Sequence, residues 1–424
     1  MLNRSLCYIL PILAAALFSS GTKKRPSPSE LIWLEDTFED AIVDHFDPES
    51  RKFSQRFCVG LGTYTREKPL VFLFVGADQP MSPSLIPVNL MRLASSFKAA
   101  VAYLEHRYFG GSFPTEDVSA KTLKDLLTIP QTVEDIRTFG EYLKRYLNSP
   151  TLQIVLFGDS YGGSLAAWVR GRYTRLFIGA VSSSAVFDIK LDNDLYASIE
   201  AQGLSNKQLG GSPKCLETVK KAHKSFANLT KSSDGRRKLE KKFNACKNIL
   251  DDRMNQLALE DYCNIKKVCR RLTKTNDDPL DAIADIFLTK TELPPNPPGC
   301  FSDTFADYIK MLEDPDNQNR ERMSRFIFCR GFGQRQPCTD ENNCPWLRTE
   351  ERLELNVRIC GAFGISEEQA KEYIDQVQTE YGGKTLKGAT NIFSINGEAD
   401  PWRSVSITEP AEGIDVYTVP LASH

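Results

Sequence analysis

The stretch IVLFGDSYGGSLAAWVR, residues 154–170, carries the strongest structural signal in this chain. Its first residues are mostly apolar and predict a buried strand, and the run that starts at Ser160 predicts a helix. Between them lies the pattern Gly158-x-Ser160-x-Gly162, followed by Gly163. Glycines permit any tight turn from a strand to a helix, so the pattern has a purely structural interpretation. A second interpretation is that the turn holds Ser160 out as a nucleophile, in a strained backbone conformation with close neighbours.

The residues on both sides of this turn predict a sheet. Apolar runs at 70–75, 100–105, 178–182, 391–395 and 416–419 predict further strands, and residues 131–147 predict an amphipathic helix. This alternation indicates a mainly parallel sheet that is covered by helices on both faces. In such a strand–turn–helix context the Gly-x-Ser-x-Gly pattern is typical of the nucleophile elbow of α/β-hydrolases, which favours the chemical interpretation of Ser160.

The middle of the chain has a different pattern. Lys, Arg and Glu dominate residues 188–387, the apolar residues have helical spacing, and most of the cysteines lie here. We therefore predict an α/β-hydrolase domain in two parts, 22–187 and 388–424, interrupted by a large disulfide-stapled helical cap insertion at 188–387. The basic run in this cap could bind an anionic ligand, but a solvated helix face is the favoured interpretation.

The N-terminus predicts export. Residues 1–21 contain one arginine, an apolar stretch from Leu6 to Phe18 and small residues at the end, which is typical of a cleaved secretory signal. A buried N-terminal helix is the alternative. No other apolar run approaches ~18 residues, so we expect no membrane span and a secreted or lysosomal protein. Lys and Arg total 53 against 55 Asp and Glu, and this balance argues against a nucleic-acid partner.

The cysteines predict disulfides and not a metal site. Eleven are present, and ten remain once Cys7 leaves with the signal, so up to five disulfides are expected. No Cys-x-x-Cys pair occurs and His223 is the only histidine in the cysteine-rich half, so we expect no metal and no cofactor. The tripeptide that begins at Asn228 is an acceptor for an N-linked sugar, in agreement with a secretory route.

The histidines narrow the choice of a catalytic base. A serine hydroxyl needs a base to take its proton and an acid behind that base, and in this fold the order along the chain is Ser, acid, His. Only two of the four histidines follow Ser160. His223 lies in the charged insertion, where a surface role is expected, whereas His424 comes just after the last predicted strand. The acid belongs after the preceding strand, where NGEADPW offers Glu398 and Asp400.

Four motifs in this chain resemble those of a known family. They are DHFDP at 44–48, EHRYFGGSFP at 105–114, GDSYGGSLAAW at 158–168 and NGEADPW at 396–402. They are similar to motifs of the secreted serine peptidases that include lysosomal prolyl carboxypeptidase, dipeptidyl peptidase II and thymus-specific serine protease. The resemblance covers residues 40–424, and its C-terminal part is most similar to the thymus-specific member.

The resemblance implies a site and a substrate class. The implied site residues are the nucleophile Ser160, the acid Asp400, the base His424 and Trp402 in the substrate pocket. In a hydrolase fold we also expect backbone N–H groups of Tyr161 and of the Gly76–Ala77 loop to stabilise the oxyanion. Cleavage of peptides beside proline is expected, typically in acidic compartments. The resemblance also implies the disulfides Cys329–Cys360 and Cys215–Cys338.

The chain departs from the family at several positions. Ser164 stands where the prolyl members have methionine, so we expect it at the wall of the substrate pocket. Arg330 is gained beside a cysteine of the cap and could change how a peptide terminus is held. Asp159 replaces a glycine next to the nucleophile. Family chains continue beyond the histidine, so we expect the chain as written to fold with Ser160, Asp400 and His424 near one another but to be weakly active.

The leading hypothesis is a serine exopeptidase with a peptide substrate. Carboxypeptidase and dipeptidyl-peptidase action both stay open, as does the formation of a homodimer. One alternative is a secreted esterase or lipase that uses the same three residues. The other is a binding protein with a catalytically weak hydrolase fold.

Overall fold

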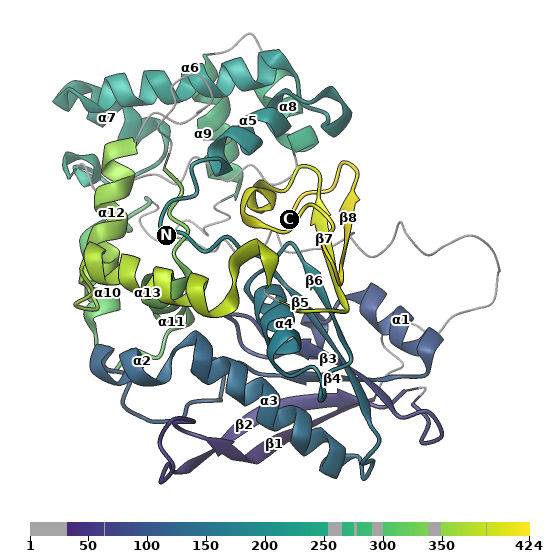
Figure 1. The fold of residues 1–424 in the computed structure, drawn as a ribbon. Coiled ribbons are helices and arrows are strands. Elements are labelled where there is room, and N and C mark those ends of the chain that lie inside the picture. Colours follow the sequence, from purple (N-terminus) through teal and green to yellow (C-terminus); the bar gives the residue numbers. More distant parts are fainter. Residues whose placement is uncertain are drawn as a thin grey trace.

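The structure is a computed structural model that describes residues 32–62, 64–252, 265–274, 278–290, 300–337, 349–386 and 388–424. The predicted signal at 1–21 lies outside the described residues. Figure 1 shows a lower part with the strands and a group of helices stacked above it. We call the part made of β1–β8 and α1–α4 the sheet body.

Eight strands form one sheet in the order β1-β2-β4-β3-β5-β6-β7-β8. Their bounds are β1 Trp33–Ile42, β2 Lys52–Gly60, β3 Leu70–Val75, β4 Ala100–Leu104, β5 Gln153–Asp159, β6 Gly179–Ser183, β7 Ile392–Gly397 and β8 Ile414–Val419. β2 pairs antiparallel with β1 and β4, whereas all other pairs are parallel. The six predicted strands are confirmed as β3–β8, and β1 and β2 are additional. This mixed sheet with its strand–turn–helix serine is an α/β-hydrolase fold.

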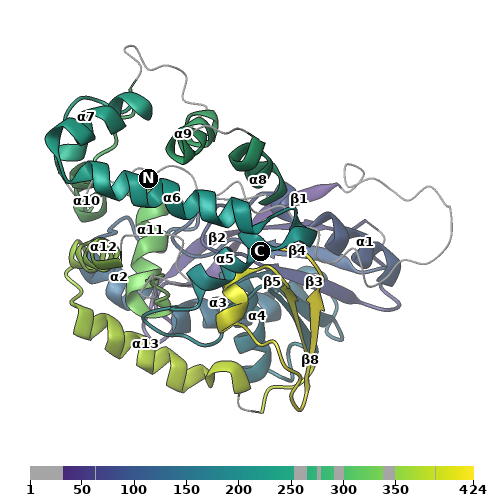
Figure 2. The same cartoon turned by 90° about the horizontal axis from the view of Figure 1, so that it is seen from above.

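Four helices cover the two faces of the sheet. They are α1 Val88–Phe97, α2 Ala120–Leu126, α3 Ile129–Tyr146 and α4 Ser160–Arg172. The Thr128 side chain caps α3 by accepting from the Gln131 N–H, and apolar residues along one stripe of this helix, such as Phe139, are buried. Residues of α3 and α4 pack in the main core on one face, and residues of α1 pack in a second core on the other face (Figure 2).

The insertion divides between two cores. Five helices share their own core around Phe226, Phe243 and Phe287, and we call them the α5–α9 bundle. They are α5 Tyr196–Ser205, α6 Pro213–Thr230, α7 Ser233–Lys242, α8 Ile265–Lys274 and α9 Pro279–Lys290. The later helices instead contribute residues to the main core of the sheet body. These are α10 Phe305–Glu313, α11 Arg320–Ile327, α12 Thr349–Gly361 and α13 Glu367–Tyr381. The exact domain boundaries stay a prediction.

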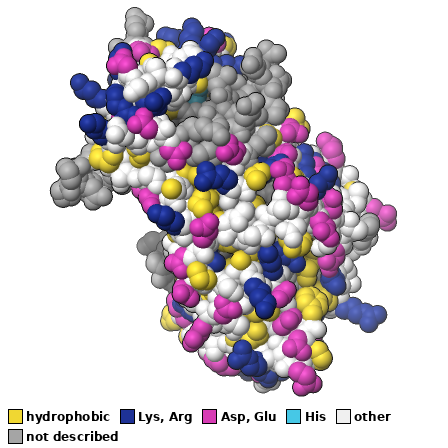
Figure 3. All heavy atoms as spheres, turned by 90° about the vertical axis from the view of Figure 1, so that its left-hand side faces the viewer, with side chains coloured by type: hydrophobic (Ala, Val, Ile, Leu, Met, Phe, Trp, Pro, Cys, Tyr) yellow, Lys and Arg dark blue, Asp and Glu magenta, His cyan; other side chains and the backbone are white. Residues whose placement is uncertain are grey.

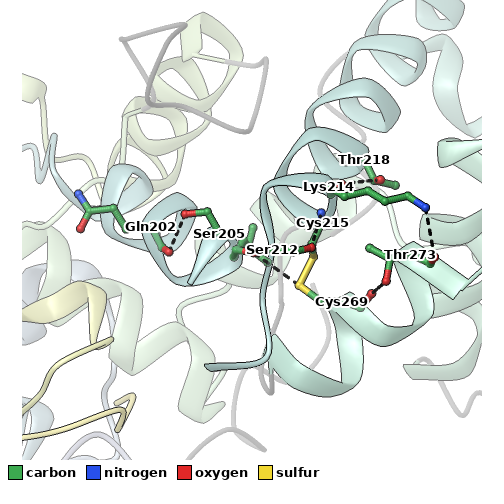
Figure 4. The surroundings of a disulfide bond; sticks show 9 residues. Gln202, Ser205, Ser212, Lys214, Cys215, Thr218, Cys269 and Thr273 are labelled. Atoms are coloured by element: carbon green, nitrogen blue, oxygen red, sulfur yellow. Dashed lines mark hydrogen bonds between the residues drawn. A yellow bond between two sulfur atoms is a disulfide. The ribbon is translucent and has the colours of Figure 1, made fainter. Parts of the chain in front are cut away.

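The observed disulfides agree with one of the two predicted pairings and differ from the other. The described residues contain three, Cys215–Cys269, Cys246–Cys300 and Cys329–Cys360. The third is as predicted, but Cys215–Cys338 is wrong, because Cys215 of α6 is bonded to Cys269 of the adjacent α8 (Figure 4). Cys338 lies outside the described residues. Five disulfides are also too many, because Cys58 is a buried free thiol whose burial raises its pKa to about 12.

Candidate active site

The turn between β5 and α4 strains the backbone of Ser160. This residue has φ of +51°, in the left-handed region that residues other than glycine rarely adopt. The glycines around it leave no space for side chains. A Cβ on Gly158 would lie 2.2 Å from the carbonyl oxygen of Gly162, and one on Gly163 would lie 3.0 Å from the Cβ of Ala185. This is the geometry of a nucleophile elbow at the carboxyl edge of the sheet.

The loop after β3 packs against this elbow. A Cβ on Gly162 would lie 2.7 Å from the carbonyl oxygen of Val75 and 3.7 Å from the backbone nitrogen of Ala77. Tyr161, directly after Ser160, is buried. The structure therefore brings the backbones of Tyr161 and of the Gly76–Ala77 loop to the same corner as Ser160, where an oxyanion would need N–H donors.

Glu105 holds the loop after β3, although its sequence position, at the end of a predicted strand and the start of a motif, suggested no role for it. Its fully buried carboxylate accepts hydrogen bonds from the Met81 N–H and the Ser112 hydroxyl, both at 2.7 Å. A Cβ on Gly110 would lie 2.0 Å from this carboxylate, so the motif needs its glycine there. A carboxylate directly after a buried strand, at the sheet edge that carries Ser160, is the signal that could have identified Glu105.

The neighbouring His106 supports Tyr161. Its Nδ1 lies 2.7 Å from the Arg107 carbonyl oxygen, and its Nε2 lies 3.2 Å from the Thr132 hydroxyl and 3.4 Å from the Tyr161 hydroxyl. Burial lowers the pKa of His106 to about 4, so the imidazole is neutral near pH 7. A neutral ring that donates from Nδ1 accepts at Nε2, and it therefore fixes the side chain that follows the nucleophile.

The acid position is occupied by Asp400, which follows β7. Asp400 is fully buried, and its Oδ1 accepts from the Trp402 N–H at 2.9 Å at the start of a short 3-10 helix, η9 (Pro401–Val405). Its Oδ2 lies 3.1 Å from Nδ1 of His424. The competing candidate, Glu398, accepts a hydrogen bond from the Leu421 N–H at 2.9 Å. The structure thus pairs Asp400 with the histidine and uses Glu398 to hold the segment before it.

His424 follows β8, the strand beside β7. The Ala399 N–H donates to the Ala422 carbonyl oxygen at 2.8 Å, and a Cβ on Gly397 would lie 2.5 Å from that same oxygen. The acid loop and the segment before His424 are therefore packed directly on each other. The His424 side chain is 19% exposed, whereas that of Asp400 is fully buried.

Two carboxylates act on the charge of His424. Burial alone would lower its pKa, but the charge and hydrogen bond of Asp400 outweigh burial, and Asp159 adds to them, so the pKa of His424 is raised. Asp159 is the residue directly before Ser160. Its own pKa is raised, chiefly by burial, although the charge of His424 opposes this. His424 is thus coupled to the elbow as well as to the acid loop.

The two predicted substrate-binding residues lie in different surroundings. The Trp402 ring centroid is 6.3 Å from that of His424 and 5.1 Å from that of Tyr196, so it lies between the histidine and α5 of the bundle. Ser164 is fully buried in α4, donates to the Val186 carbonyl oxygen at 2.7 Å and accepts from the Val186 N–H. The predicted contact of Ser164 with substrate is therefore corrected to a packing role, because its hydroxyl is engaged and out of reach of solvent.

Other predicted residues make contacts outside the predicted triad. The Arg330 guanidinium lies 4.0 Å from the centre of the Tyr373 ring, and its Nε donates to the Lys124 carbonyl oxygen at 3.1 Å. Asn228 is exposed near the end of α6, where a sugar could be attached. The expected surface role of His223 is wrong, because this side chain is only 4% exposed and faces the core of the bundle.

The described residues contain no cluster of His, Cys, Asp and Glu side chains that could hold a metal ion. None of the described helices is both long and apolar enough to cross a bilayer.

The chain is similar to known proteins along most of its length. A family model described as serine carboxypeptidase S28 matches residues 41–265 and 251–424. Thymus-specific serine protease of Mus musculus is 26% identical over an alignment of 431 positions, which covers 92% of this chain and 81% of that protein. Lysosomal Pro-X carboxypeptidase of Bos taurus is 25% identical over an alignment of 443 positions, which covers 95% of this chain and 85% of that protein. Among solved structures, an esterase of Pyrobaculum calidifontis is 16% identical with a TM-score of 0.29, covering 40% of this chain and 50% of that one.

Proposed function

Because this chain belongs to the serine carboxypeptidase S28 family, we propose that it is a serine exopeptidase that cleaves peptides beside proline, with Ser160, His424 and Asp400 as its triad. The observation that carries this proposal is the 3.1 Å contact between His424 Nδ1 and the buried Asp400, in a fold where Ser160 has the backbone of an elbow and the adjacent Asp159 acts on His424. Relatives named as lysosomal support a secretory or lysosomal location.

The proposed mechanism follows from the contact between Asp400 and one ring nitrogen of His424. Because Nδ1 of His424 faces Asp400, Nε2 is the atom that can take the proton of the Ser160 hydroxyl. The Ser160 oxygen then attacks the peptide carbonyl carbon, and the Tyr161 and Ala77 N–H groups donate to the resulting oxyanion. The protonated His424 gives its proton to the leaving amine. Water hydrolyses the acyl-enzyme in the same way, which restores the free serine.

The exopeptidase and proline specificities rest on the family and on one contact. Trp402 offers an aromatic face beside His424, and a flat, apolar proline ring fits such a face. An esterase would need the same triad, so the triad alone does not favour either class. The peptide assignment is supported by the serine protease and carboxypeptidase names of the relatives.

Covalent labelling tests the nucleophile. The full chain should react with a fluorophosphonate probe, and Ser160→Ala should abolish labelling without changing the melting temperature. Ser96→Ala provides the matched control, because Ser96 is an exposed serine on α1 that only bonds its own helix. Labelling that persists in Ser160→Ala would move the nucleophile to another residue.

A peptide set tests the substrate class. Proline-containing peptides with a free or blocked N-terminus, and with a free or blocked C-terminus, separate dipeptidyl-peptidase from carboxypeptidase action. We expect cleavage that depends on one free terminus and on proline, and neither should occur with Ser160→Ala. Hydrolysis of simple esters with no cleavage of any peptide would favour the esterase alternative.

A further inference from the structure

The surface of α8 is strongly cationic. Its ten residues, IKKVCRRLTK, include five Lys or Arg and no acidic residue. Val268, Cys269 and Leu272 are buried toward the bundle core, which leaves the opposite side of the helix to Lys266, Arg270 and Lys274. These three are spaced four residues apart, so they form one exposed stripe with about 6 Å between successive positions.

The stripe continues onto α6. The disulfide Cys215–Cys269 joins the two helices, and Lys214 Nζ lies 3.5 Å from the Thr273 carbonyl oxygen (Figure 4). Lys214 and Lys221, seven residues apart, both lie exposed on α6. We call Lys214, Lys221, Lys266, Arg270 and Lys274 the basic stripe.

Nearby acids are engaged elsewhere. Asp285 of α9 pairs with Arg271 at 3.2 Å, and Asp281 pairs with Lys242 of α7. No carboxylate of the described residues pairs with Lys266, Arg270 or Lys274, although Glu217 pairs with Lys221 at 3.5 Å. Figure 3 faces the α7 end of the bundle, away from α8, and shows that Lys and Arg also gather at that end, whereas acidic and basic side chains are mixed over the sheet body. The near-zero net charge of the chain therefore hides a local excess of positive charge.

We propose that the basic stripe binds a linear sulfated polysaccharide. Evenly spaced cations on a helix held in place by a disulfide match a polymer with regularly repeated anionic groups, and binding would release the polymer's counterions. The exposed residues of α6 and α8 include no large apolar side chain that could insert into a lipid surface. The stripe contains no aromatic residue on which nucleic-acid bases could stack. The inference is independent of the peptidase chemistry.

Salt elution from immobilised heparin tests the proposal on the full chain. The wild type should stay bound at physiological ionic strength, and Lys266→Gln/Arg270→Gln/Lys274→Gln should bind at least tenfold more weakly. In this variant the slope of log Kd against log salt should be shallower by about three, one for each removed charge. The control is Arg92→Gln/Lys121→Gln/Lys371→Gln, which removes three exposed charges from outside the bundle and should elute like the wild type.

Two further arms identify the anion. Desulfated heparin should not retain the wild type, and vesicles rich in phosphatidylserine should bind it more weakly than heparin does. Unchanged melting and probe labelling of the stripe variant would exclude misfolding as the cause of weaker binding. Equal retention of the stripe variant and the wild type, a wild type that is not retained, or stronger binding to the vesicles would each overturn the proposal.

Discussion

The sheet body and the α5–α9 bundle are stabilised in different ways. In the body, the parallel strands are buried on both faces of the sheet. The reactive groups follow the ends of these strands, so the sheet determines their positions. The bundle has a smaller core of its own, and disulfides anchor its helices, Cys215–Cys269 among them. The two regions meet near the triad, where Trp402 touches Tyr196 of α5. Chemistry should thus depend on the body, and the bundle should shape access and binding.

The largest effect is expected in the body, at the acid. Asp400→Asn should reduce kcat by about 10³–10⁴, because the amide no longer holds the imidazole in the tautomer with its proton on Nδ1. Glu398→Gln is the matched control, since the Glu398 carboxylate accepts from the Leu421 N–H and not from His424, and it should change kcat far less. Steady-state kinetics on one proline-containing peptide measures both. A larger loss in Glu398→Gln would show that the acid is misassigned.

The second effect concerns the bundle alone. Replacing Cys215 and Cys269 by alanine removes a disulfide that joins residues 54 positions apart in the sequence. The loss of this cross-link should lower the free energy of unfolding of the bundle by at most about 4 kcal/mol. Hydrogen exchange should increase in α6 and α8 before it increases in β5. Labelling of Ser160 should remain, because no atom of the triad comes from the bundle. If β5 loses protection together with α8, the two regions unfold as one unit.

A third effect concerns the pH dependence of the stability of the sheet body. The pKa of His106 falls from 6.5 to about 4 on folding, so the unfolded chain binds its proton first as the pH drops. Its contribution is fully present above pH 6.5 and is lost between pH 6.5 and 4, by about 3 kcal/mol in total. Urea unfolding at several pH values measures this slope. His106→Asn, which keeps a side-chain donor, should flatten it, and an unchanged slope would assign the acid sensitivity to other groups.

The smallest effect should appear in the pH profile of activity. His424 must be neutral to accept a proton, and its pKa is raised above 6.5, so kcat/KM should fall as the pH drops below that raised value. Asp159→Asn removes one of the two charges behind this shift, and the acidic limb should move to lower pH by up to about one unit. Asp415→Asn, an exposed change on β8, serves as control. A limb that does not move in Asp159→Asn would mean that only Asp400 acts on His424.

The strands β3–β8 and the elbow could be predicted from short stretches of sequence. Runs of apolar residues indicate the buried strands, and the closely spaced glycines indicate the tight turn at the elbow, so neighbouring residues are enough to predict both. β1 escaped prediction because only two of its ten residues are buried and four are charged. His223 lies four residues after Val219 and three before Phe226, so helical spacing alone placed it on the buried stripe. The surrounding lysines had obscured that pattern.

The remaining errors concern contacts between segments far apart in the chain. The partner of Cys215 depends on which helix packs beside α6, and no spacing of cysteines contains that information. The role of Ser164 depends on the close approach of Val186, 22 residues away. Glu105 organises backbone groups on both sides of itself, and only the folded structure shows that Met81 is one of them.

The position of His424 beside an edge strand has a consequence for inactivation. Among the described strands, β8 lies at one end of the sheet and pairs only with β7, so separating it breaks one ladder where a central strand would break two. Such edges open locally at a lower free energy than the whole fold. Opening β8 would remove the base from Ser160 while the elbow and the main core stay intact. Heating should therefore silence the enzyme reversibly several degrees below its unfolding transition, with turnover lost before far-ultraviolet circular dichroism reports any global melting.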